Sequence, residues 1–171
     1  MMSDEKTLNI LTEDKIQRIL KRMSIQILEN NLGASKVVLV GITGQGYQMA
    51  LLLQKILQTA HSTAITCDLA ELIIDKKNPV SGDISLSIDI NLLNHQIVIL
   101  VDDVINTGRT QAYGIKFLLT AAIKKLETAI LVDRSHKVFP VSTNYCGLAL
   151  STTLEEHVEV SLETGRGAFL Y

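Results

Sequence analysis

The stretch IVILVDDVINTGRT, residues 97 to 110, decides the fold. Its first part, Ile97 to Val101, is apolar without a polar break, and two adjacent acids, Asp102 and Asp103, follow. An unbroken run of Ile, Val and Leu is typical of a strand that is covered on both faces, as strands in parallel sheets are. The chain then passes through a polar, glycine-containing turn at residues 106–110 and becomes helical again.

That polar turn has the composition of a phosphate-binding loop. Between a strand and a helix, backbone N–H groups converge on one point and the helix N-terminus adds partial positive charge. Carboxylates beside such a loop would repel a phosphate, so Asp102 and Asp103 need another role, and accepting hydrogen bonds from sugar hydroxyls supplies one. The alternative is a buried strand that ends in a polar turn without binding anything. It explains the two adjacent acids and the spacing of Thr107-Gly108-x-Thr110 less well than a sugar-phosphate site does. The stretch therefore predicts a site for a phosphorylated sugar.

The pattern Val101-Asp102-Asp103-Val104-Ile105-x-Thr107-Gly108-x-Thr110 resembles the phosphoribosyl-pyrophosphate (PRPP) motif of type I phosphoribosyltransferases. The resemblance implies an α/β fold with a mainly parallel central sheet, flanking helices and a small hood with a flexible loop. It implies that Asp102 and Asp103 are the catalytic residues and hold the ribose hydroxyls of PRPP. The residues that would wrap the 5′-phosphate are Asn106, Thr107, Gly108, Arg109 and Thr110.

A second glycine-rich loop follows the predicted strand Lys36–Val40 and precedes a helix from about Tyr47 to Thr59. Its three glycines lie in Gly41-Ile42-Thr43-Gly44-Gln45-Gly46, and by themselves a tight turn would explain them. PRPP carries phosphates at both ends and needs two such loops. The resemblance implies that Thr43, Gly44, Gln45 and Gly46 hold the pyrophosphate.

The rest of the chain alternates between helical and strand patterns, which predicts an α/β domain with a mainly parallel sheet. In such sheets ligands bind at the carboxyl ends of the strands, where both loops fall. We expect residues 1–171 to form one domain. The further predicted elements are a helix Leu8–Asn31 with Thr12 as a candidate N-cap, a strand Ala64–Ile74, a surface loop Asp75–Asp83, a return strand Ser85–Ile90, a helix Ala112–Lys125 with Ile115, Leu118, Leu119, Ala122 and Ile123 facing inward, a strand Thr128–Asp133 and a final strand His157–Leu162.

Composition excludes some classes of function. The net charge is −2 and the pI about 6.1, so there is no overall electrostatic attraction to nucleic acid or anionic membranes. The N-terminal residues lack a signal-peptide core, and no apolar run approaches the ~20 residues of a membrane helix. We therefore expect a cytoplasmic protein. Cys67 and Cys146 have no motif around them and are interpreted as structural thiols.

The resemblance extends to the pyrimidine-operon attenuator/uracil phosphoribosyltransferase (PyrR) group. The segment Leu131–Pro140 is similar to that group's Val-Asp-Arg-x-His-Arg-x-x-Pro, and Asn144–Gly147 to its Asp-Tyr-x-Gly. This implies Mg²⁺-dependent transfer of the phosphoribosyl group from PRPP to uracil, giving UMP and pyrophosphate, as in pyrimidine salvage. It also implies a homo-oligomer, a dimer or tetramer. The implied base-binding residues are Val132, Asp133 and Arg134.

Two departures from that group bear on catalysis. Its pyrophosphate loop usually reads Lys-Thr-Arg-Gly, and here neutral Gln45 replaces the basic residue. A charge-assisted contact of that kind is worth about 1.5–3 kcal/mol. The hood of that group supplies Tyr-Arg where this chain has Asp75-Lys76-Lys77-Asn78. A lysine ammonium is a point charge, whereas the planar guanidinium of arginine can donate two parallel hydrogen bonds. Asn106 and Arg134 both argue against a purine base.

Two alternatives to a uracil transferase stay open. One is a UMP-responsive RNA-binding attenuation regulator, which needs a basic face. The stripe Lys15, Arg18 and Arg22 is interpreted as solvated surface rather than as that face. The other is a relative that binds PRPP or nucleotide with weak or no turnover, for which Gln45 and the altered hood segment are the motivation.

Overall fold

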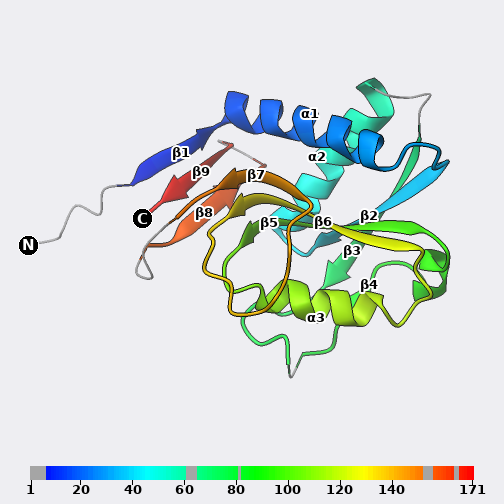
Figure 1. Cartoon of the computed structure of the whole chain (residues 1–171). Helices are drawn as coiled ribbons and strands as arrows, with labels where there is room; N and C mark the ends of the chain where they lie inside the picture. Colours follow the sequence, from blue (N-terminus) through cyan, green and yellow to red (C-terminus); the bar gives the residue numbers. More distant parts are fainter. Residues whose placement is uncertain (1–6, 61–64, 81, 152–155, 164–165) are drawn as a thin grey trace, which may run out of the picture.

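The fold is built on a six-stranded sheet with the strand order β4-β3-β2-β5-β6-β7 (Figure 1). The computed structural model describes residues 7–60, 65–80, 82–151, 156–163 and 166–171. Neighbouring strands run parallel except for the short β4, which pairs antiparallel with β3, so the expected mainly parallel sheet is confirmed. The strands are β2 (Lys36–Ile42), β3 (Thr66–Ile73), β4 (Ser85–Leu86), β5 (Ile97–Ile105), β6 (Lys125–Asp133) and β7 (Tyr145–Ala149).

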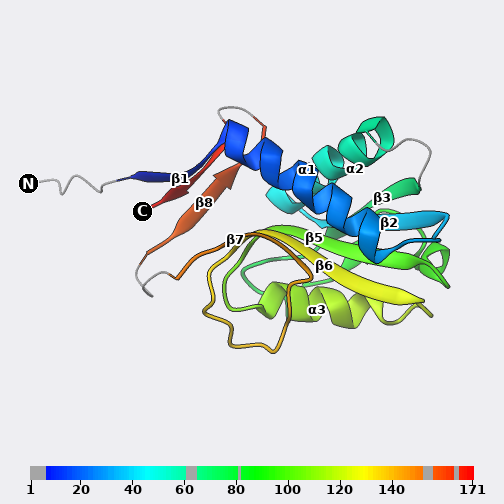
Figure 2. The same ribbon diagram turned by 45° about the horizontal axis from the view of Figure 1, so that its top comes forward.

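Helices cover both faces of this sheet. Figure 2 shows α1 (Glu13–Asn30) and α2 (Gln45–Ala60) on one side and α3 (Arg109–Leu118) on the other. Strand side chains alternate between the two faces, and the central strands therefore carry two apolar cores. In β2, for example, Val37 and Leu39 join the core under α1 and α2, while Val38 and Val40 join the core over α3. This double burial is why β2 and β5 read as unbroken apolar runs.

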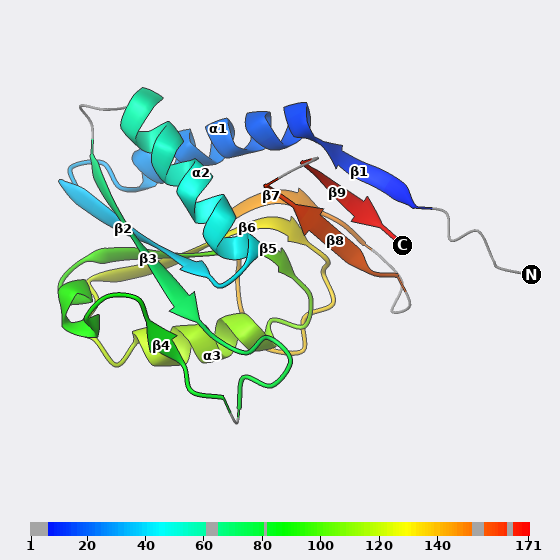
Figure 3. The same cartoon turned by 180° about the vertical axis from the view of Figure 1, so that it is seen from behind.

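A second, three-stranded sheet stands at the end of the main sheet toward which β5 and β6 point (Figure 3). It consists of β1 (Leu8–Thr12), β9 (Gly167–Leu170) and β8 (Val158–Ser161), in the antiparallel order β1-β9-β8. Because β8 also contacts β5, this small sheet walls one side of the carboxyl end of the main sheet. It corresponds to the small hood that the family resemblance implies, whereas the segment Asp75–Asn78, which was expected to belong to that hood, follows β3 and lies outside this small sheet.

At the N-terminus the predicted helix was too long. Residues 8–12 form β1, and α1 begins at Glu13 because Thr12 Oγ1 accepts a hydrogen bond from the backbone N–H of Lys15 at 3.4 Å. Thr12 as N-cap is confirmed. Lys15, Arg18 and Arg22 are all exposed, as the solvated interpretation expects, although the guanidinium of Arg22 also donates to the carbonyls of Cys146 and Gly147 at 2.9 Å each and ties α1 to β7.

Other boundaries also shifted. The helix predicted to reach Lys125 ends at Leu118, because β6 pairs with β5 from Lys125 onward and its start must already be extended. Leu119 is 59% exposed and Ala122 is exposed, so their expected inward packing was wrong. Only Ser85 and Leu86 of the predicted return strand pair with β3, and Ile90–Leu93 forms a 3₁₀ turn, η1.

The remaining predictions agree with the structure more closely. β8 confirms the predicted strand His157–Leu162, although β9 follows it and is the last strand. The strand and loop predicted at 64–74 and 75–83 are confirmed, apart from Ala64 and Ser81, which lie outside the described residues. Both cysteines are free, and within the described residues no helix is long and apolar enough to cross a membrane.

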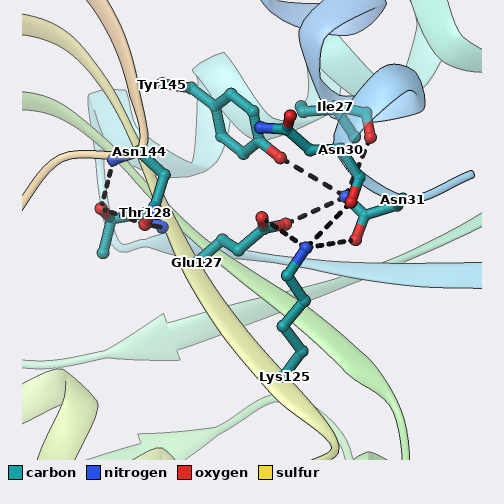
Figure 4. Close-up of polar contacts among 8 residues, drawn as sticks. All are labelled: Ile27, Asn30, Asn31, Lys125, Glu127, Thr128, Asn144 and Tyr145. Carbon is teal, nitrogen blue, oxygen red and sulfur yellow. Dashed lines mark hydrogen bonds and ion pairs between the residues drawn. The ribbon is translucent and has the colours of Figure 1, made fainter.

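A polar cluster fastens the last turn of α1 to the beginning of β6 (Figure 4). The Asn31 side-chain amide donates to Glu127 Oε2 at 3.0 Å and to the Ile27 carbonyl at 2.8 Å. Lys125 Nζ lies 2.8 Å from Glu127 Oε1 and donates to Asn31 Oδ1 at 3.0 Å. Tyr145 packs beside them, and burial raises the pKa of its hydroxyl to about 12. The buried Glu127 carboxylate therefore depends on Asn31 and Lys125 for its hydrogen bonds.

Asn31→Ala should lower the free energy of unfolding by about 1–3 kcal/mol, because a buried carboxylate loses one of its donors. Urea unfolding followed by circular dichroism measures the change. Glu29→Ala, on an exposed position of the same helical turn, is the control and should change stability by no more than about 0.5 kcal/mol. Equal losses in the two variants would contradict a special role for the cluster.

Candidate functional site

The site is organised around Asp102 and Asp103 near the carboxyl end of β5. Strand pairing continues through both acids to Ile105, beyond the predicted apolar run. Asp102 is 1% exposed and Asp103 9% exposed, so the two adjacent carboxylates are held in a largely desolvated position. Such a pair cannot be left without counter-charges and donors.

Lys76 supplies the counter-charge. Its ammonium lies 2.8 Å from Asp102 Oδ1 and 3.2 Å from Asp103 Oδ1. Lys76 follows β3, and β2 separates β3 from β5 in the sheet, so the side chain reaches over the end of β2 to the acids. The sequence offered Lys76 only as a replacement for a hood residue, and no local pattern indicated this long-range contact.

Gln111 holds the other side of Asp102. Its Nε2 donates to Asp102 Oδ2 at 2.7 Å, and the backbone N–H of Asp103 donates to Asp102 Oδ1 at 3.0 Å. Gln111 lies in the first turn of α3 and is buried, and sequence reasoning missed it. The side chain of Asp102 is 2% exposed and that of Asp103 is 13% exposed. Asp103 is thus the acid that is more accessible to a ligand, and Asp102 is the more deeply buried of the two.

The protonation equilibria reflect this crowding. Burial, and next the charge of Asp103, raise the pKa of Asp102 well above its usual range, although Lys76 opposes the shift. Burial alone would lower the pKa of Lys76, but the two carboxylates outweigh it and raise that pKa above its ordinary value.

The loop Asn106–Thr110 lies directly above the acids and forms the N-terminal approach to α3. Gly108 is its turning point, with a left-handed φ of +79°. A side chain there would also crowd the carbonyl oxygen of Phe139, since a Cβ would lie 3.2 Å from it. The Thr107 carbonyl accepts from the backbone N–H groups of Val138 and Phe139 at 2.9 and 3.0 Å, which braces the loop. All five residues 106–110 line one pocket, as a phosphate-binding loop requires.

The second glycine loop reaches the acid pair at Gly46. A Cβ on Gly46 would lie 2.7 Å from Asp102 Oδ1 and 3.0 Å from the Val101 carbonyl, so only glycine lets the start of α2 come this close. Gln45 lines the pocket, but its Oε1 accepts from the Leu162 backbone N–H at 2.8 Å. Thr43 donates its hydroxyl to Glu71 at 2.9 Å. Of the predicted loop residues, Gln45 lines the pocket, whereas Thr43, Gly44 and Gly46 do not.

Of the three predicted base-binding residues, too, only one lines the pocket. Arg134 lines the pocket, and its guanidinium donates to the Glu156 carbonyl. Val132 is buried in the core. Asp133 pairs with Lys137 at 2.7 Å and accepts from the Ser135 N–H. Burial alone would raise the pKa of Asp133, but its hydrogen bonds and the charge of Lys137 outweigh burial and lower that pKa. Asp133 thus shapes the turn after β6, while Arg134 reaches the pocket.

The pocket that these elements enclose has a volume of about 680 Å³, which is the size of a small-molecule site. Its cationic side chains are Lys76, Lys77, Arg109 and Arg134. The sequence predicted a strand at His157–Leu162 but did not indicate that this strand forms a wall of the pocket. The lining residues from this wall are His157, Val158, Glu159 and Val160.

Comparison with known proteins identifies the family. The model of the phosphoribosyl transferase domain matches residues 6–163, which include both loops and the acid pair. The chain belongs to the phosphoribosyltransferase family. Proteins named Bifunctional protein PyrR are similar over most of its length. That of Staphylococcus saprophyticus is 34% identical over 160 residues, covering 90% of this chain and 91% of its own length. That of Haemophilus ducreyi is 33% identical over 162 residues, covering 90% and 89%.

Solved phosphoribosyltransferase structures share the fold. The hypoxanthine phosphoribosyltransferase of Trypanosoma cruzi superposes with a TM-score of 0.74 at 17% identity, covering 94% of this chain and 89% of its own. A hypoxanthine-guanine phosphoribosyltransferase from Bacillus anthracis gives 0.68 at 18% identity, covering 83% and 80%. At such identities the likeness confirms the type I phosphoribosyltransferase fold and carries no information about the base.

Asp102→Asn should raise thermal stability at neutral pH, because folding no longer buries a second carboxylate beside Asp103. A carboxyl whose pKa is raised by folding destabilises the folded state increasingly as pH rises above the unfolded value of about 4. The gain in melting temperature over wild type should therefore be larger at pH 7.5 than at pH 5.

Melting curves at the two pH values test this expectation. Asp83→Asn, on an exposed loop, is the control and should show no pH-dependent difference from wild type. A variant of Asp102 that melts below wild type at pH 7.5 would contradict the expectation.

Proposed function

We propose that this protein transfers the 5-phosphoribosyl group of PRPP to uracil, giving UMP and pyrophosphate. The observation that carries the proposal is that Asp102 and Asp103 line one pocket together with the first residues of α2 and of α3. Two anion-binding helix ends on either side of a carboxylate pair match a sugar that carries phosphate at one end and pyrophosphate at the other.

In this assignment the loop Asn106–Thr110 binds the 5′-phosphate through backbone N–H groups and the hydroxyls of Thr107 and Thr110. Asp103, supported by Asp102, accepts hydrogen bonds from the ribose hydroxyls. The residues 43–46 and the start of α2 receive the pyrophosphate. The negative charge of the acid pair favours a ribose that gains positive character as the pyrophosphate departs. Catalysis would thus rest on positioning and electrostatics rather than on a nucleophile.

Mg²⁺ fits the donor set. This ion is typically bound by one or two carboxylates together with substrate phosphates, rather than by a cage of protein ligands. Among the described residues there is no cluster of three or more His, Cys, Asp or Glu side chains that could hold a metal ion. Asp102 and Asp103 would hold it, and it would neutralise charge on the leaving pyrophosphate.

Uracil is the proposed acceptor. Arg134 and the β8 wall line the part of the pocket next to the acids, which is where the base would lie. The proteins named PyrR support a pyrimidine, and Asn106, in place of a carboxylate, argues against a purine. A cytoplasmic location and a dimeric or tetrameric assembly belong to the same proposal.

The relatives named Bifunctional protein PyrR support a second function, UMP-responsive RNA binding, because their name assigns them two activities. The net charge of −2 requires that any RNA-binding face be a local basic patch. A gel-shift experiment with a pyrimidine-operon leader RNA at low salt tests it. A UMP-dependent shift would support this function, and no shift would remove it.

With uracil, PRPP and Mg²⁺ the wild-type protein should form UMP, and Asp103→Asn should lower kcat/KM by about a hundredfold, as loss of one transition-state contact does. Pyrophosphate release measured with uracil, hypoxanthine, guanine and orotate gives both results. Asp83→Asn is the control and should keep wild-type activity.

Other outcomes identify the remaining hypotheses. Product formed from hypoxanthine but not from uracil would overturn the proposed base. Tight PRPP binding without product from any base would identify a binding protein without turnover, the alternative that neutral Gln45 raises.

A further inference from the structure

The carboxylate oxygens of Asp102 and Asp103 are not equally available to a ligand. Asp102 Oδ1 accepts from the Lys76 ammonium at 2.8 Å and from the Asp103 backbone N–H at 3.0 Å. Asp102 Oδ2 accepts from Gln111 Nε2 at 2.7 Å, and Asp103 Oδ1 accepts from Lys76 at 3.2 Å. Within the part of the chain that the structure describes, no hydrogen bond or ion pair reaches Asp103 Oδ2. This oxygen is therefore the most accessible one for the ribose hydroxyls of the proposed function.

Gln111 is a polar residue on the buried face of α3. The buried residues of this helix are Gln111, Gly114 and Leu118, at the spacing i, i+3 and i+7. Apolar side chains normally occupy such positions, and only 2% of Gln111 is exposed. Gly114 lets the helix approach the sheet, because a Cβ there would lie 3.0 Å from Leu72 Cδ2 and 3.5 Å from Leu100 Cδ2. The amide of Gln111 is thereby held within reach of the end of β5.

The hydrogen bond from Gln111 begins a chain of contacts that ends at Asp103. Gln111 holds Asp102 Oδ2, and Asp102 Oδ1 holds the Lys76 ammonium. Lys76 in turn lies 3.2 Å from Asp103 Oδ1. The last torsion of an aspartate side chain is broad, so a carboxylate without a donor on its second oxygen can turn. Without Gln111 the Asp102 carboxylate would lose its fixed orientation, and Lys76 and Asp103 would lose theirs with it.

We propose that Gln111 is a positioning residue, which acts through Asp102 to set the preference of the pocket for a ribose with free hydroxyls. It fixes the acid that orients Asp103, and a ligand-binding group must be held by such supporting contacts to within a fraction of an ångström. Because α3 begins at Arg109, the helix that starts in the proposed 5′-phosphate loop also carries the support for the ribose-binding acids. This inference rests on the proposed function.

Calorimetric titration with UMP and with 2′,3′-dideoxyuridine 5′-monophosphate tests the inference, because the two nucleotides differ only in the ribose hydroxyls. Gln111→Met keeps the length of the side chain without its donor. The affinity of this variant for UMP should fall by about tenfold, the effect of losing a hydrogen bond to a charged group. Its affinity for the dideoxynucleotide should not fall, so the ratio of the two affinities should decrease by about tenfold.

Three results would overturn the inference. They are equal affinities of the wild-type protein for the two nucleotides, an unchanged ratio in Gln111→Met, and an equal fall in affinity for both nucleotides. The last result is the one expected if Gln111 only stabilises the fold, because a general loss of structure affects both ligands alike.

A double-mutant cycle distinguishes support of Asp102 from a direct contact with the nucleotide, since Gln111 also lines the pocket. Asp102→Ala removes the acceptor of the Gln111 amide and should itself lower the ratio. Adding Gln111→Met to Asp102→Ala should lower the ratio no further, because the two substitutions break the same contact. A further fall of similar size in the double variant would indicate a direct contact and overturn the inference.

Lys116→Met is the matched control, because Lys116 is exposed on the same helix, and it should keep the wild-type ratio. Melting curves establish that each variant is folded. If Gln111→Met is not folded, Gln111→Asn takes its place, since its side chain is one methylene shorter and withdraws the donor from Asp102. Failure of the wild-type protein to bind UMP would instead overturn the proposed function, so the two failures are distinguishable.

Discussion

The contact between Lys76 and the carboxylates of Asp102 and Asp103 is the interaction on which the site depends. Two adjacent acids in a desolvated position repel each other, and each would lose hydration on folding. The ammonium at 2.8 and 3.2 Å and the Gln111 amide at 2.7 Å make the arrangement tenable. These partners come from the loop after β3 and from the first turn of α3, so the packing of the sheet and its helices sets the distances in the site.

The sheet order explains why the partners meet. β2 lies between β3 and β5, so the loops after these strands converge at one edge of the sheet. Gly46 lets α2 begin against the acid pair, and Gly108 turns the chain into α3 above it. The two helix N-termini thus point to the same pocket from adjacent strands. The β8 strand closes the third side, and brings Glu159 and two valines into the wall.

Sequence reasoning found what is encoded locally. The apolar run from Ile97 predicted a buried strand, which the structure confirms, and the turn around Gly108 lines the pocket, where its role as a ligand loop stays a prediction. Lys76 and Gln111 could not be predicted as partners of Asp102, because neither contact follows a spacing rule: Lys76 follows a different strand, 26 residues earlier, and Gln111 lies nine residues later, beyond the turn into α3. The strand β1 was mistaken for helix because its partner, β9, is at the other end of the chain. Strands stabilised by distant partners leave little periodicity in a five-residue segment.

The site also shows how one position can compensate for another. Gln45 stands where the PyrR group usually has a basic residue, and its Oε1 accepts a hydrogen bond from the Leu162 N–H, while the segment after β3 carries Lys76 and Lys77. The loop is thereby tied to the chain that follows β8, and positive charge enters the pocket from the segment after β3.

A crystal structure with PRPP and Mg²⁺ bound tests the central claim most directly. The account predicts the 5′-phosphate in the loop Asn106–Thr110, ribose hydroxyls on Asp103, and pyrophosphate at the start of α2. PRPP bound elsewhere, or bound with its ribose away from the acid pair, would contradict it.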